Sequence, residues 1–204
     1  KIHRCDAVIE NITEKVTVKQ DLYQKMDEIC KPDTCFIANT SCISITAIAA
    51  FTSRMDQVIG IHFMNPAALK STVELIAGVH TNQDTIQKAE RFLSELGKSF
   101  VSVGDFPGFV SNRISHLFMN EAAFAVQDRL AEPAQIDKIF RECFGHKLGP
   151  LETADLIGLD VVADSLDILF ESYHDSKYRC CPLLRKMVSA GMLGKKSGKG
   201  FYCY

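Results

Sequence analysis

The sequence has no excess of charge of either sign. Its 204 residues include 23 Lys and Arg and 25 Asp and Glu, which gives a formal net charge of −2. A nucleic-acid or anionic membrane partner normally calls for a basic patch on the protein. We therefore expect neither nucleic acid nor a membrane to be the main partner.

Segments that would direct the chain into a membrane are also lacking. A signal peptide needs a basic stretch followed by an apolar one, and the residues after Lys1 do not form one. The longest uncharged stretch, residues 34–53, has the length of a bilayer span, but Asn39, Thr40 and Ser41 at its centre are polar. These absences predict a cytoplasmic protein.

Signatures of metal sites and structural disulfides are absent as well. The eight cysteines include no Cys-x-x-Cys pair, and no cysteine and histidine spacing matches a zinc site. Cys180 and Cys181 are adjacent, but vicinal disulfides are rare. Because a chain of this length can bury a full core, it needs no such cross-links. We expect no metal and reduced thiols.

The most informative absence is a glycine-rich dinucleotide turn. The pattern Gly-x-Gly-x-x-Gly normally joins the first strand and helix of a dinucleotide-binding domain, and this sequence does not contain it. The segment Gly104–Gly108 has the wrong spacing. We therefore expect the first strand of this chain to be a middle strand of its sheet, and the first strands and the glycine-rich turn to lie before Lys1.

Short apolar segments alternate with helix-like segments over the first hundred residues. The expected strands are 7–9, 35–38, 58–61, 73–76 and 100–103. The expected helices are 16–30, 44–51 and 83–96, the first with a core face of Val18, Leu22, Met26 and Ile29. Such alternation is typical of βαβ units and a mainly parallel sheet. We expect an α/β domain over residues 1–105.

After residue 105 the pattern becomes helical. The expected helices are 107–128, 133–144, 150–173 with a break at Gly158, and 182–190. The apolar stripe of the first is Val110, Ile114, Leu117, Phe118 and Ala122. We expect residues 106–204 to form an all-α domain.

Polar residues follow each of the first three expected strands. In a parallel sheet the carboxyl ends of the strands share one edge, and ligands bind in the crevice outside it. The side chains expected to converge there are Glu14, Ser41 and His62.

His62 is the natural proton acceptor in this group, because its unperturbed pKa of about 6.5 lies near working pH. Glu74 lies within the apolar run 73–76, where a buried charge needs a partner, and His62 is the candidate. Two other interpretations remain open at this point. His62 could be a core histidine with its hydrogen bonds satisfied, and Glu74 could face solvent from an edge strand.

Three further features have both a functional and an ordinary interpretation. The Ser41 hydroxyl can donate to a substrate oxygen, although serine is also a common helix cap. Asn112 lies off the apolar stripe of its helix, and so faces either a cleft between domains or solvent. The segment Gly194–Tyr202 places three lysines among three glycines, which suits either a phosphate or a solvated loop.

Together these motifs resemble the 3-hydroxyacyl-CoA dehydrogenase family. The motifs that carry the resemblance follow the family order along nearly the whole chain: Glu10–Glu14 with Lys19, Asn39–Ser41, His62–Pro66 with Glu74, Pro107–Arg113, Gly149–Asp160 and Gly194–Tyr202. The resemblance implies a partial Rossmann-like NAD-binding domain followed by a helical domain. The closing Gly-Phe-Tyr matches the usual end of the family, so the missing part is expected before Lys1.

The resemblance also implies an activity, the reversible transfer of hydride between NAD and a 3-hydroxyacyl thioester. His62 takes the hydroxyl proton in this scheme, Glu74 orients His62, and Ser41 and Asn112 hold the reacting oxygen or carbonyl. The implied contacts to the nicotinamide half of NAD are Glu14, Lys19, Ser41, Asn65 and Lys195. The helical domain is implied to form a homodimer interface and a wall of the substrate cleft.

Two departures from the family pattern leave the acyl carrier open. Cys42 stands where a small or hydroxyl residue is common, and Gly145–Pro150 is similar to members that act on an acyl carrier protein in polyketide-type pathways. The substrate is therefore expected to be an acyl-CoA or an acyl-carrier-protein thioester. A non-catalytic dimerisation module is a further alternative, but it has no reason to keep His62 and Glu74. Without the glycine-rich turn, residues 1–204 alone are expected to bind NAD poorly.

Overall fold

A computed structural model describes residues 2–204 and divides into two compact units. The first unit ends at Phe109, and the second runs from Val110 to Tyr204. The boundary expected at residue 105 lies shortly before this division. Within residues 2–204, no helix has both the length and the apolar character that crossing a membrane requires.

The first unit is built on a five-stranded sheet of order β1-β2-β3-β4-β5. The strands are β1 (Ala7–Glu10), β2 (Cys35–Ala38), β3 (Val58–His62), β4 (Thr72–Ala77) and β5 (Ser99–Val103). β1, β2 and β3 run parallel, β4 is antiparallel to β3, and β5 is parallel to β4. The expectation of a mainly parallel sheet is confirmed, and the carboxyl ends of β1, β2 and β3 share one edge.

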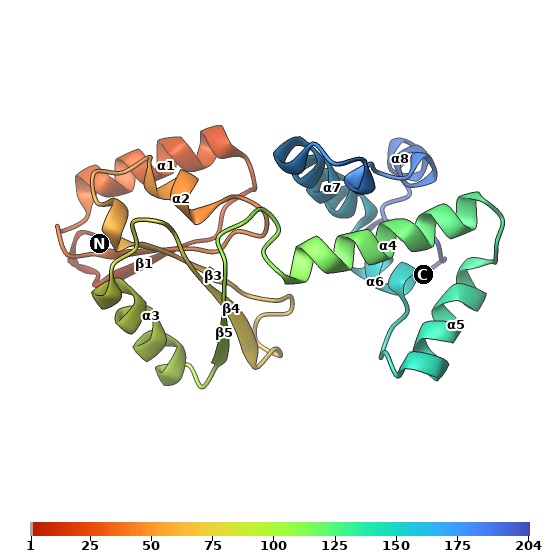
Figure 1. Cartoon of the computed structure of the whole chain (residues 1–204), viewed down its shortest axis with the longest axis horizontal. Helices are drawn as coiled ribbons and strands as arrows, with labels where there is room; N and C mark the ends of the chain where they lie inside the picture. Colours follow the sequence, from red (N-terminus) through yellow and green to blue (C-terminus); the bar gives the residue numbers. More distant parts are fainter. Residues whose placement is uncertain (1) are drawn as a thin grey trace. The chain divides into compact units, whose positions relative to one another are not determined.

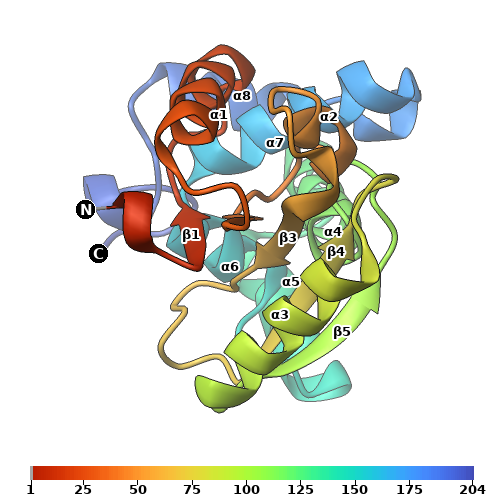
Figure 2. The same cartoon turned by 90° about the vertical axis from the view of Figure 1, so that its left-hand side faces the viewer.

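Helices cover both faces of this sheet, with α1 (Val16–Ile29) and α2 (Ile45–Ala49) on one face and α3 (Gln83–Glu95) on the other (Figures 1 and 2). Alternate residues of β2 face the two helical layers on opposite sides of the sheet. Phe36 and Ala38 pack on the side of α1 and α2, while Cys35 and Ile37 pack on the side of α3. Burial on both faces explains why this strand is a continuous apolar run.

The core face of α1 differs from the expected one. Its buried residues are Lys19, Tyr23 and Met26, whereas Val18 and Ile29 are 42% and 52% exposed. The expected face was therefore wrong by about one residue around the helix. Counting apolar residues alone missed the true face, because a lysine with a buried carboxylate partner can take a core position.

The regular secondary-structure elements described for the second unit, residues 110–204, are all helices. Its α-helices are α4 (Ser111–Gln127), α5 (Pro133–Phe144), α6 (Pro150–Ile157), α7 (Leu159–Tyr173) and α8 (Pro182–Ser189) (Figure 1). Residues such as Met119, Ala154, Leu166 and Leu184 bring α4, α6, α7 and α8 into one core. The expected break at Gly158 is confirmed, where a φ of 108° ends α6.

Helix α4 begins later than the sequence pattern predicted. Gly108 and Phe109 have positive φ values of 80° and 46°, which interrupt the helix expected from Pro107. Ser111 is therefore the first helical residue. The Phe109 side chain instead joins the core of the first unit, where it is 3% exposed.

The buried face of α4 also differs from the expected apolar stripe. Val110 and Ile114 are 50% and 63% exposed, while His116 and Asn120 are buried. Asn120 donates to the backbone carbonyl of Arg179 and accepts the backbone N–H of Cys181. Polar groups that find such partners can be buried without a large penalty, so the expected stripe was wrong at Val110 and Ile114, although Ala122 is buried as expected.

The segment Gly194–Tyr202 folds back onto α6 instead of forming an open loop. The buried Asp155 carboxylate accepts hydrogen bonds from the backbone N–H groups of Phe201 and Tyr202, both at 3.0 Å. A side chain at Gly200 would collide with that carboxylate. The Tyr202 hydroxyl donates to Asp137 of α5 at 2.6 Å, so the tail is tied to two buried carboxylates.

Candidate active site

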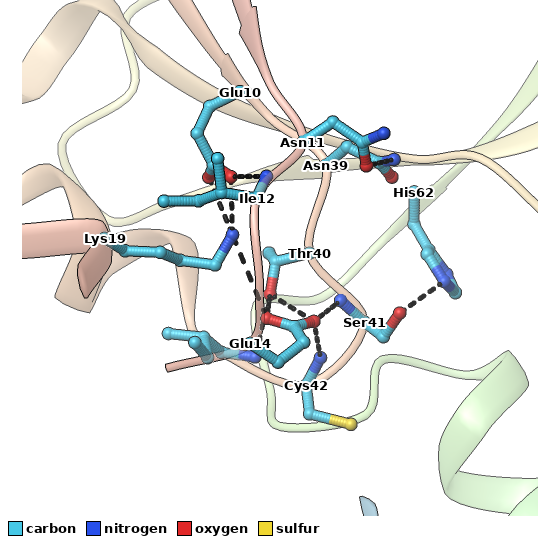
Figure 3. A network of polar contacts seen from close by, with 11 residues as sticks. Glu10, Asn11, Ile12, Glu14, Lys19, Asn39, Thr40, Ser41, Cys42 and His62 are labelled. Atoms are coloured by element: carbon cyan, nitrogen blue, oxygen red, sulfur yellow. Dashed lines mark hydrogen bonds and ion pairs between the residues drawn. The ribbon is translucent and has the colours of Figure 1, made fainter. Parts of the chain in front are cut away.

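The ends of the three parallel strands are tied together by one side-chain amide. Asn39, which follows β2, donates from Nδ2 to Oδ1 of Asn11 after β1 at 2.8 Å. Its Oδ1 accepts the backbone N–H of Phe63 after β3 at 3.1 Å. This arrangement fixes the edge at which the polar residues were expected to meet (Figure 3).

His62 and Glu74 lie opposite each other on neighbouring strands. His62 ends β3, and the antiparallel register pairs it with Glu74 of β4. The His62 Nδ1 atom lies 2.8 Å from Oε2 of Glu74, and the two residues are 5% and 6% exposed. Because β4 lies between β3 and β5, the solvent-facing interpretation of Glu74 is wrong.

The other ring nitrogen of His62 faces Ser41. The Ser41 Oγ atom lies 3.1 Å from Nε2 of His62 (Figure 3). A carboxylate on Nδ1 favours the tautomer whose Nδ1 carries the proton, so that Nε2 is the nitrogen that can accept one. The arrangement therefore places a proton acceptor and a hydroxyl at the strand edge. The Phe109 ring packs 5.9 Å from the imidazole ring, centroid to centroid.

Glu14 holds the loop that carries Ser41. Its carboxylate accepts hydrogen bonds from the backbone N–H groups of Ser41 and Cys42, the second at 3.3 Å. It also accepts the Thr40 hydroxyl at 2.8 Å. The Glu14 side chain remains 32% exposed. One carboxylate therefore organises the turn after β2 and still faces outward.

The family resemblance implies that Lys19 contacts NAD, but its side chain is buried. Its ammonium is fully buried, lies 2.7 Å from Oε2 of Glu10, and is 4.0 Å from Oε2 of Glu14. Burial and the charge of Glu10 raise the pKa of the neighbouring Tyr23. Glu74 was predictable as a charge inside an apolar run, whereas the role of Glu10, the last residue of β1, was not predicted.

Asp105 is a second anchor whose role was not predicted. Its carboxylate accepts the backbone N–H groups of Ile45 and Thr46 at 2.7 and 2.8 Å and the Ser44 hydroxyl at 2.9 Å. It therefore caps α2, which begins directly after the Ser41 loop. The sequence feature that could have indicated this role is the position of Asp105 in the segment Gly104–Gly108, which contains glycine and proline.

The remaining predicted residues lie elsewhere. Asn65 is exposed in the loop after β3, before the cis proline Pro66. Asn112 is half-buried in the first turn of α4, and Lys195 is exposed in a short 3-10 turn; both belong to the helical unit. Residues 2–204 contain no group of three His, Cys, Asp or Glu that could hold a metal ion.

Two family models together match nearly the entire chain. The model described as 3-hydroxyacyl-CoA dehydrogenase, NAD binding domain, matches residues 1–106, and that described as 3-hydroxyacyl-CoA dehydrogenase, C-terminal domain, matches residues 108–204.

Individual relatives agree with these models. A probable 3-hydroxybutyryl-CoA dehydrogenase of Bacillus subtilis is 46% identical over 98% of this chain and 69% of its own length. The crystal structure of (S)-3-hydroxybutyryl-CoA dehydrogenase from Ralstonia eutropha matches with a TM-score of 0.95 and 41% identity, over 100% of this chain and 72% of that one. The structure of FadB2 from Mycobacterium tuberculosis has a TM-score of 0.97, 36% identity and the same coverage.

The Rossmann-like sheet, the helical unit and these matches define an NAD-dependent oxidoreductase. The chain belongs to the 3-hydroxyacyl-CoA dehydrogenase family. The partly exposed Glu14 carboxylate and the exposed Asn65 amide are hydrogen-bonding groups of the kind that a carboxamide, such as that of nicotinamide, requires.

Proposed function

We propose that the protein interconverts a 3-hydroxyacyl-CoA and its 3-oxoacyl form, and that 3-hydroxybutyryl-CoA is its substrate. The observation that carries the proposal is the series of contacts from Ser41 through His62 to Glu74, at 3.1 and 2.8 Å. The relatives from Bacillus subtilis and Ralstonia eutropha are named for 3-hydroxybutyryl-CoA, which supports both the acyl group and CoA as the carrier.

In this proposal His62 accepts the proton of the substrate hydroxyl at Nε2. Glu74 accepts a hydrogen bond from Nδ1, which keeps Nε2 available and stabilises the imidazolium that forms. NAD, when bound, would supply the hydride acceptor for the carbon that carries this hydroxyl. In the reverse direction His62 returns the proton to the oxygen of the 3-oxo group.

Ser41 is proposed to hold the reacting oxygen beside His62. Its hydroxyl already lies at Nε2, so a substrate oxygen placed there would contact both groups. Asn112 is proposed to hold the reacting oxygen or the thioester carbonyl on the strength of its match to the family motif. Glu14, Asn65 and Lys195 are proposed on the same ground to contact the nicotinamide half of NAD. Lys19 is proposed to act there from its buried position beside Glu14.

A serine, a histidine and a carboxylate in series are also the parts of a hydrolase triad. Acyl transfer further needs backbone N–H groups directed at a developing oxyanion. The N–H groups of Ser41 and Cys42 instead donate to the Glu14 carboxylate, whose negative charge would oppose an oxyanion at this place. This contact favours proton transfer from a hydroxyl over cleavage of the thioester.

We further propose that the helical unit forms a homodimer. Val110 at the start of α4, Ile114 of α4 and Ile139 of α5 are 50%, 63% and 49% exposed, and Phe118 and Phe140 of these helices line a groove of about 490 Å³. Exposed apolar residues of this kind on adjacent elements typically mark a protein interface. A second copy of the chain would cover them.

The activity is tested by the loss of NADH absorbance with acetoacetyl-CoA in the full-length protein. We expect turnover in the unchanged protein and a kcat about 10²- to 10⁴-fold lower in His62→Ala. Equal activity of the two proteins would contradict the proposal. Running an acyl-carrier-protein thioester in parallel tests the carrier, and we expect the CoA ester to have the higher kcat/KM.

A further inference from the structure

A buried ion pair lies next to the loop that carries Ser41. Lys19 is fully buried and Glu10 is 3% exposed, and Nζ of Lys19 lies 2.8 and 2.7 Å from the two oxygens of Glu10. A buried ion pair gives little net stability, because the cost of removing both charges from water offsets their attraction. Apolar residues of similar size often serve a core equally well. Stability alone therefore does not account for this pair.

The pair is connected to the loop through Glu14. The Glu14 Oε2 atom lies 4.0 Å from the same ammonium. The Glu14 carboxylate in turn accepts the backbone N–H of Ser41 and the hydroxyl of Thr40. Figure 3 shows these contacts in series, from Glu10 through Lys19 and Glu14 to Ser41.

Glu10 controls which carboxylate the ammonium approaches most closely. Its Oε1 also accepts the backbone N–H of Ile12 at 2.6 Å, which fixes the turn that leads from β1 to Glu14. If the charge of Glu10 were removed, Glu14 would be the nearest carboxylate left to Lys19. The ammonium and Glu14 would then close their 4.0 Å gap, and Glu14 would move away from the Ser41 backbone.

We propose that Glu10 is a positioning residue for the dehydrogenase reaction: it keeps Lys19 from drawing Glu14 inward, so that Glu14 holds Ser41 at its contact with His62. The inference rests on the proposed function, since it acts through Ser41 and His62. A displacement of about 1 Å at a reacting group can cost about 10²-fold in rate. Glu10 therefore affects the reaction rate through these intermediate residues.

The test compares Glu10→Gln with Asp27→Asn in the full-length protein. Asp27 of α1 forms an ion pair with Arg54 in which the side chains are 14% and 10% exposed, so it is a matched control without contacts to the Ser41 loop. We expect Glu10→Gln to lower kcat for acetoacetyl-CoA about 10- to 100-fold, with KM within about threefold. Asp27→Asn should keep kcat within about twofold. Melting temperatures are measured for both variants.

A shorter acid at the same position gives a graded second test. In Glu10→Asp the charge remains but is drawn back by one methylene, and we expect kcat to fall about 3- to 10-fold. Equal kcat in Glu10→Gln and Asp27→Asn overturns the inference. If Glu10→Gln does not fold, Glu10→Asp is compared with the same control, and an unchanged kcat in Glu10→Asp overturns it.

His62→Ala, measured in the same assay, separates the two proposals. If His62→Ala keeps full activity, the proposed function fails at its proton acceptor. If His62→Ala is inactive while Glu10→Gln behaves like Asp27→Asn, the proposed function stands and the positioning role of Glu10 is wrong.

Discussion

Glu74 lies directly opposite His62 across the one antiparallel pair of strands in the five-stranded sheet, with 2.8 Å between Oε2 and Nδ1. The two residues are separated by twelve positions in the sequence, and the connection between β3 and β4 brings them together. The partner of the imidazole is therefore set by strand register, which fixes the ring more firmly than a loop residue would.

Replacing this carboxylate should slow the reaction. In Glu74→Gln the amide can donate to Nδ1 and so favour the tautomer whose proton is on Nε2, which cannot accept another. The substitution also removes the counter-charge of the imidazolium. We expect kcat to fall about 10²- to 10⁴-fold. Thr72→Val, at the exposed start of the same strand, is the control and should keep kcat within about twofold. An active Glu74→Gln would show that Glu74 does not support the base.

The contribution of Asp27 to stability should depend on pH. Burial alone would raise the pKa of this carboxyl, but hydrogen bonds from Ser53 and Arg54 outweigh it and hold the pKa below its ordinary 3.8. A lowered pKa in the folded state means stability that is present above about pH 4 and lost as the pH falls through the folded pKa.

Urea unfolding of the unchanged protein and of Asp27→Asn at several pH values checks this. We expect Asp27→Asn to be less stable by about 1–3 kcal/mol at pH 7. The difference should shrink at pH values below 3.8. A difference that grows on acidification would rule out the ionised carboxylate as its cause.

Tyr202→Phe should destabilise the helical unit. The substitution removes a 2.6 Å hydrogen bond to the buried Asp137, and we expect a loss of about 1–3 kcal/mol at pH 7. Burial, together with the bond to Asp137, raises the pKa of Tyr202 far above its ordinary 10.0. The stability that the hydroxyl provides is therefore present below pH 10 and lost as the pH rises further. Unfolding curves measured on both sides of pH 10 should show the free energies of unfolding of the unchanged protein and Tyr202→Phe converging as the pH rises.

The proposed dimer is tested at Ile114. In Ile114→Glu a charge replaces an apolar side chain that is 63% exposed in the single chain, so folding should be little affected. If a second copy of the chain covers this face, Ile114→Glu should weaken dimer association about 30-fold or more. Val79→Glu, at a position 81% exposed in the first unit, is the control. Sedimentation at several concentrations gives the result, and equal association of the two variants would place the interface elsewhere.

The order of elements was predictable because strand and helix periodicities differ and because glycine and proline mark most boundaries. The faces of α1 and α4 were not. Lys19 and His116 are buried, while Val18 and Ile114 are exposed. Periodicity reports where apolar residues lie on a helix, but burial also depends on whether a polar group finds its partner in another element.

The same distinction applies to the site. His62 and Ser41 were predictable because polar residues that follow parallel strands meet at one edge. Glu10 and Asp105 were missed, because their importance comes from contacts with Lys19 and with the start of α2. Such contacts connect residues through the fold, and no local pattern in the sequence records them.

The attachment of the segment Gly194–Tyr202 to Asp155 has a consequence for synthesis on the ribosome. Residues 200–204 are translated after every helix of the second unit, and they provide the backbone N–H groups and a hydroxyl that satisfy Asp155 and Asp137. Until these residues emerge, the Asp155 carboxylate lacks the partners that its burial requires, while Asp137 has only the backbone N–H groups of Leu151 and Glu152. The helices of the second unit therefore become a stable unit only once residues 200–204 are in place, although domains generally begin to fold in the order of their synthesis.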